Sequence, residues 1–215
     1  KRDKKAYNLK LNIKAISEVL SAVKDYLFPY EKISKKFLKI NNESDLINFI
    51  KEKSAFVTQS TLYGYLKTRM GLKQNMMFTD DIFIDSVNKA KWNIFSEAVT
   101  DLTFFAVSYL NTKHNVDILD PNKIYQTILD NEIINGLPNE MCEKYKSRFK
   151  EKLNSFNIEE YCSDKPFSNS CNALFHWAPI ADELKELDKE IVINSIKNKW
   201  MLVVADFEKI PVNLK

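Results

Sequence analysis

Few side chains in this sequence combine the type and the spacing that a reaction needs, and the first such pair is a thiol near an imidazole. Cys171 precedes His176 by five residues, and a cysteine beside a histidine base is a common nucleophile. His176 stands between Phe175 and Trp177, so a packed, hydrogen-bonded histidine is the commoner explanation. The other histidine, His114, falls in a polar stretch and is expected to be exposed. The pair Cys171 and His176 therefore stays an alternative, as the centre of an enzyme of unknown type.

A second polar set combines an amide, a phenol and two cations: Gln59, Tyr63, Lys67 and Arg69. The first three are spaced by four, so a helix places them on one face. Such a polar face could bind a ligand, or it could pair with Asp85 or Asp101 on a neighbouring helix. We favour an interhelical hydrogen-bond network and keep the set as a candidate binding face.

The third set is basic and lies at the N-terminus. Residues 1–39 hold eleven Lys or Arg against four Asp or Glu, in a chain whose net charge is only +3. An anionic partner could bind there, whether nucleic acid, lipid headgroups or an acidic protein surface. The candidate contacts are Lys4, Lys5, Lys10, Lys14, Lys35, Lys36 and Lys39. A solvated basic arm, with a flexible start over residues 1–10, is the commoner explanation.

The motifs of common cofactor and metal enzymes are absent from the sequence. The chain has only three glycines, and neither a P-loop nor a Rossmann fingerprint occurs. No serine stands in the G-x-S-x-G elbow of an esterase, and no E-x-x-H pair suggests a di-metal bundle. We therefore expect no cofactor and no metal.

The cysteines bear on the compartment. Their number is odd and they lack C-x-x-C spacing (Cys142, Cys162 and Cys171), which is typical of the cytoplasm or another reducing intracellular compartment and indicates no zinc site. No apolar run reaches the roughly 18 to 20 residues of a membrane span.

The element that must position these groups is a long helix over residues 79–110. Its apolar residues recur at helical spacing from Phe83 to Tyr109, and Thr79 can cap its N-terminus. Leu102 to Leu110 is apolar nearly all round, so the helix should end inside the protein.

Similar patterns predict the other helices. The expected segments are 11–28 ended by Pro29, 33–40, a helix from Ser44 to a break near Lys53 and Ser54, 55–70 ended by Gly71, 121–135 between Asp120 and Gly136, one from Pro138 to about Leu153, a short one from Pro179, and 189–208 capped by Asp188. Residues 154–170 are expected to be irregular. Gly64 should allow close approach of a neighbouring helix, and Trp200–Ala205 should lie in the core against the central helix.

Two segments resemble an uncharacterised family of helical proteins from alphaproteobacteria. One runs Ala55-Phe56-Val57-Thr58-Gln59-Ser60 and on through Leu62–Gly71, and the other comprises Ala178-Pro179-Ile180, Asp188–Val192 and Asn194-Ser195-Ile196. Together they cover about a fifth of the chain. The resemblance implies an all-helical fold, and some members carry an automatic esterase label that the missing serine elbow does not support.

The sequence thus predicts one all-α domain over residues 1–215, a bundle of roughly seven to nine helices around helix 79–110 with helix 189–208 against it. For function we expect a non-enzymatic protein-interaction protein, an adaptor or an accessory subunit of a larger assembly. An enzyme and a binder of anionic surfaces are the alternatives.

Overall fold

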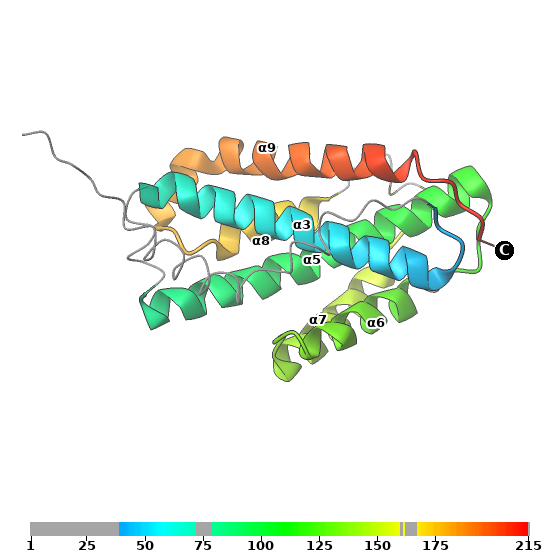
Figure 1. The fold of residues 1–215 in the computed structure, drawn as a ribbon, viewed down its shortest axis with the longest axis horizontal. Coiled ribbons are helices and arrows are strands. Elements are labelled where there is room, and N and C mark those ends of the chain that lie inside the picture. The colour runs from blue at the N-terminus through cyan, green and yellow to red at the C-terminus, as the bar shows by residue number, and fades with distance from the viewer. Residues whose placement is uncertain (1–38, 72–78, 160, 162–166, 215) are drawn as a thin grey trace, which may run out of the picture.

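The computed structural model describes residues 39–71, 79–159, 161 and 167–214. These residues form a helical bundle without a strand, which confirms the all-α fold class (Figure 1). Its helices are α3 (Glu43–Met70), α5 (Asp81–His114), α6 (Pro121–Ile133), α7 (Asn139–Leu153), α8 (Ser168–Trp177) and α9 (Asp182–Phe207). The predicted helix 11–28, most of helix 33–40 and the flexible start over residues 1–10 lie outside the described residues.

The long central helix is confirmed, with corrected ends. Every residue from 90 to 108 of α5 is buried, and the helix packs on α3, α8 and α6. Asp80, not Thr79, is the cap, since its carboxylate accepts the backbone N–H groups of Ile82 and Phe83. The helix continues beyond Leu110 to His114, because an exposed last turn tolerates polar residues and its negative end favours Lys113 and His114. Asn115 ends it in the left-handed conformation.

The predicted break near Lys53 and Ser54 is wrong, because α3 is continuous there. Ser54 is buried within the helix, and the Lys53 ammonium lies 2.8 Å from the Asp206 carboxylate of α9. The cap is Asn42 instead of Ser44, and its side chain accepts the Asp45 N–H at 2.9 Å. Contacts with other helices keep this polar turn helical, although its local sequence does not favour a helix.

Helices α6 and α7, both predicted from the sequence, form a pair on one side of α5 (Figure 1). Asp120 caps α6 ahead of Pro121, and Gly136 has a positive φ of 99° in the turn between the helices. Tyr125 of α6 stacks on Phe149 of α7 with ring centroids 4.0 Å apart. These local signals, a cap, a proline and a glycine, were sufficient to place both helices.

The C-terminal third differs most from the prediction. Helix α8 begins at Ser168, inside the segment expected to be irregular, and ends at Trp177. Helix α9 is one helix from Asp182, so Asp188 lies in its second turn and caps nothing. Helix α9 packs mainly on α8 and α3, and it meets α5 through Phe207, whose ring lies 5.6 Å from that of Tyr109.

The start of the described chain lies beside its end. The Ile40 N–H donates to the Pro211 carbonyl at 3.0 Å, and the Asn213 N–H donates to the Ile40 carbonyl at 2.8 Å. Residue 39 therefore enters the bundle next to the C-terminal end of α9. Over the described ranges, no helix is both long enough and apolar enough to cross a membrane.

Candidate functional site

The predicted polar face on α3 is divided between two sides of the helix. Lys67 and Arg69 are exposed, whereas Gln59 and Tyr63 are half-buried. Burial raises the pKa of the Tyr63 phenol well above its usual value. Arg69 points toward α9, about 160° around the helix from Lys67. The four side chains therefore do not converge on one ligand.

Arg69 belongs instead to a cluster that joins α3 to α9. Its guanidinium binds both carboxylate oxygens of Asp188, with Nε 2.5 Å from Oδ2, and the Tyr65 hydroxyl donates to Oδ2 at 2.9 Å. Arg69 holds the pKa of Asp188 below its usual range, and burial together with Asp188 raises that of Tyr65 to about 12. The sequence suggested an interhelical network from this set to Asp85 or Asp101 of the central helix, but the cluster observed includes only Arg69 of the set and pairs it with Asp188 of α9.

A small pocket of about 270 Å³ lies next to this cluster, lined by Gly64, Thr68 and Ser195 among others. No atom of another helix lies within 4 Å of the position that a Cβ on Gly64 would take. The expected close approach of a helix at Gly64 is therefore wrong. The glycine leaves open space at the surface between α3 and α9.

Cys171 and His176 do not form a catalytic pair. Cys171 is buried and His176 is exposed on the same short helix, α8, so the two side chains lie on different sides of it. Burial raises the pKa of the Cys171 thiol to about 12, and the buried Asp101 carboxylate acts in the same direction. The expectation of a packed His176 is also wrong, since its side chain faces solvent beside Trp177.

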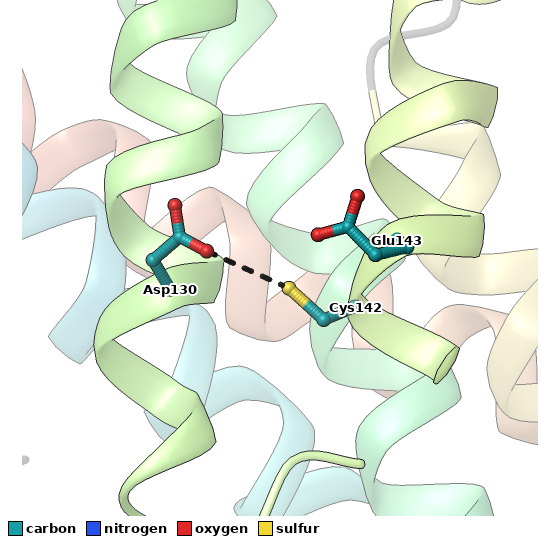
Figure 2. Close-up of side chains that lie close together, drawn as sticks. All are labelled: Asp130, Cys142 and Glu143. Atoms are coloured by element: carbon teal, nitrogen blue, oxygen red, sulfur yellow. Dashed lines mark hydrogen bonds between the residues drawn. The ribbon is translucent and has the colours of Figure 1, made fainter. Parts of the chain in front are cut away.

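Asp130, Cys142 and Glu143 are the described side chains that come closest to a metal site (Figure 2). They lie on α6 and α7, and the Cys142 thiol is 4.0 Å from Asp130 Oδ1. The Lys146 ammonium binds both carboxylates, at 2.6 Å from Asp130 and 2.9 Å from Glu143. Burial also raises the pKa of Cys142, which disfavours the thiolate that a metal would need. The cluster is an ion-paired link between two helices.

A buried polar network around Asp101 was not predicted from the sequence. Asp101 is fully buried on α5, and its carboxylate accepts the Ser170 N–H at 2.7 Å, the Asn169 amide at 2.8 Å and the Tyr161 hydroxyl at 3.2 Å. Burial raises its pKa, and the bonds from residues 169 and 170 oppose the rise. Because Phe167, the residue before α8, offers no side-chain cap, Asp101 supplies the missing acceptor for that helix.

The network extends from Asp101 in two directions. The Trp200 indole donates to Ser170 Oγ at 2.9 Å, which ties α9 to α8. Lys152 of α7 donates to Asn169 at 2.8 Å and to Glu97 of α5 at 2.5 Å. Four helices therefore meet at a set of buried groups whose hydrogen bonds are satisfied. We assign this network a structural role. The only signal in the sequence was an acid just before an apolar run.

Lys91 is another buried charge on α5. Burial lowers the pKa of its ammonium to about 8, while the nearby Glu132 opposes that shift. The ammonium also lies 4.5 Å from the centroid of the Trp92 ring. Lys91 does not line the pocket beside Gly64, and we assign it no chemistry.

The most distinctive feature of the protein surface is the outward face of α9. We use this name for Leu184, Leu187, Ile191, Asn194, Asn198, Met201 and Leu202. Leu187 is 77% exposed, Ile191 72%, Met201 68% and Leu202 57%. The prediction that Trp200–Ala205 lies in the core is therefore wrong for Met201 and Leu202, because only one side of α9 meets α3 and α8. Helix α9 runs along one edge of the molecule (Figure 1).

A groove adjoins the outward face near Met201. It has a volume of about 840 Å³ and lies between α9, the start of α8 and the end of α5. Its walls are mainly apolar and include Phe105, Phe167 and Val204, and Lys113 and Lys197 lie at its rim. The groove and the outward face share Met201.

Of the candidate contacts for an anionic partner, Lys39 alone lies in the described part of the chain, where it is exposed. The other six lysines, Lys4, Lys5, Lys10, Lys14, Lys35 and Lys36, lie outside it. No protein-family model, curated protein or solved structure matches this chain.

Proposed function

We propose that this protein is a non-enzymatic helical interaction protein that docks a protein partner on the outward face of α9. The observation that carries the proposal is the exposure of Leu187, Ile191, Met201 and Leu202 along one helix. Soluble proteins rarely expose a row of several large apolar side chains along one helix unless the row binds something. Such a row offers the apolar anchors from which interface cores are built.

The other exposed large apolar residues in the described ranges do not form such a row. Ile82 begins α5, Ile118 lies in a loop, and Ile134 follows α6. Single exposed apolar residues need no explanation. This contrast supports α9 as the candidate interface.

The enzymatic alternatives receive less support from the same residues. The Cys171 thiol is buried, and burial disfavours the thiolate, which is its reactive form. The polar set on α3 is divided between two sides of its helix. The Asp101 network has its hydrogen bonds satisfied inside the bundle. The described residues therefore support a docking surface better than they support a reaction centre.

The test compares two double variants by native co-purification and quantitative mass spectrometry. Leu187→Glu/Ile191→Glu charges the outward face, and Ile118→Glu/Ile134→Glu is the matched control at exposed isoleucines elsewhere. We expect a stoichiometric partner that the control retains and the α9 variant loses, because charging central apolar anchors costs an interface at least tenfold in affinity. Equal partner recovery from both variants, or a native chain that neither recovers a partner nor self-associates, contradicts the proposal.

A further inference from the structure

Six residues of the outward face of α9, together with the half-buried Ala205, have the spacing of a coiled-coil seam, and Leu202 lies on the flank of this seam. Leu184, Leu187, Ile191, Asn194, Asn198, Met201 and Ala205 follow one another at intervals of three and four residues. This is the a and d pattern of a heptad repeat, in which each side chain fits between residues of a facing helix. The seam is apolar at both ends and has two asparagines near its middle. A helix with the same pattern is therefore the geometry that fits it.

The charges beside the seam are opposite in its two halves. Glu183 and Glu190 flank the N-terminal half, and Lys197 occupies the equivalent flank of the C-terminal half. Glu190 and Lys197 are both exposed, and neither side chain makes an ion pair or a hydrogen bond with the described residues. Both charges are therefore available to a helix that docks on the seam.

These charges select one orientation for a second α9. In an antiparallel pair centred near Ile193, Glu190 of one chain faces Lys197 of the other, and symmetry repeats the contact. A parallel pair would set Glu190 against Ser195 and Lys197 against Leu202, which gives no charge pair. The antiparallel arrangement is therefore self-complementary.

The same arrangement sets Leu184 against Met201 of the other chain and brings the two copies of Asn194 close to the twofold axis, whereas Asn198 faces Leu187. Asparagine amides both donate and accept, so the two Asn194 side chains can bond to one another across the axis. Polar residues at seam positions restrict the register at some expense of stability.

We propose that the partner docking on the outward face of α9 is a second copy of this chain, in an antiparallel α9–α9 pair held by two Glu190–Lys197 contacts. The inference rests on the proposed function and names its partner. It accounts for the exposure of the seam and for the reversal of charge along its flank.

The first test is sedimentation equilibrium of the intact chain from low to high micromolar concentration. Native protein should dimerise, and Glu190→Lys or Lys197→Glu should weaken the dimer roughly tenfold, because each replaces two attractions by two repulsions. The double variant Glu190→Lys/Lys197→Glu restores both pairs and should dimerise within about threefold of the native chain. Both residues are exposed, so folding is not at risk. A monomer at all concentrations, or a double variant as weak as the singles, overturns the proposal.

The second test uses a short thiol-specific cross-linker to read the orientation. Asn194→Cys should link to its own copy, whereas Leu184→Cys should not, since antiparallel copies of residue 184 lie about 28 Å apart along the axis. The parent protein supplies the background from its natural cysteines. Efficient linking at both positions contradicts the antiparallel pair. A monomeric native chain whose α9 double variant still loses a different protein in the co-purification excludes the second copy and leaves the proposed function standing.

Discussion

Cys171 offers a direct measurement of whether the chain has a reactive thiol. The side chain is buried on α8, and burial raises its pKa to about 12, so almost none of it is thiolate at neutral pH. We expect Cys171 and Cys142, also buried, to alkylate slowly at pH 7 in the folded protein and rapidly after unfolding. Mass spectrometry of labelled peptides measures both rates. Fast native labelling of Cys171 alone would support the enzyme alternative.

Asp101 tests the buried network at the level of one atom. Asp101→Asn keeps the shape but replaces one carboxylate oxygen by an NH2 group, so either the Ser170 N–H or the donors Asn169 and Tyr161 lose their acceptor. We expect a loss of about 1 to 3 kcal/mol in the free energy of unfolding, measured by urea denaturation. Asp85→Asn, an exposed acid on the same helix, is the control and should change stability by less than about 0.5 kcal/mol. Equal effects would mean that the network contributes little.

Between elements, the bond from Arg69 to Asp188 fastens α3 to α9. Arg69 lowers the pKa of Asp188 below that of the unfolded chain, so this stabilisation is present above about pH 4 and is lost as pH falls through the folded pKa. Arg69→Gln should therefore reduce the free energy of unfolding at pH 7, and the deficit should shrink at pH 3. Urea denaturation at both pH values measures it.

The control for this prediction is Lys67→Gln, which removes another exposed cation two residues away on α3. The control should behave like the native chain at both pH values, since Lys67 makes no described bond to Asp188. A deficit for Arg69→Gln that is the same at pH 7 and pH 3 would show that the charge pair is not its source.

The helix boundaries show how contacts between elements override local signals. Lys53 and Ser54 suggested an end to α3, yet the ion pair of Lys53 with Asp206 and the burial of Ser54 keep the helix continuous. Asp188 is a residue type that often caps helices, but it lies inside α9, where Arg69 of α3 binds it. In each case the deciding partner is more than a hundred residues away in the chain.

For the whole molecule, the uneven charge leads to a prediction about anionic partners. Residues 1–39 carry an excess of seven positive charges, so the remainder of the chain is net negative. Any binding to RNA, anionic vesicles or acidic proteins through this segment should weaken steeply between low and physiological salt. Changing Lys4, Lys5, Lys10, Lys14, Lys35, Lys36 and Lys39 to glutamine should abolish that binding in a salt titration.

Two exposed lysines of α7, Lys144 and Lys150, provide the control for this titration. Their change to glutamine should leave the binding nearly intact if the N-terminal charges act together. Binding that is absent at low salt, or that survives the seven substitutions, would leave the segment as a solvated basic arm.

What the sequence determined by itself was local. The period of the apolar residues predicted α5 as the buried centre, and Asp120, Pro121 and Gly136 placed α6, because capping and periodicity depend on neighbours within a few residues. Tertiary structure alone decided which side of each helix meets water. It left Met201 and Leu202 exposed on α9, buried Cys171 away from His176, and gave Asp101 its partners on α8. These outcomes depend on which helices pack together, and a pattern within one helix does not contain that information.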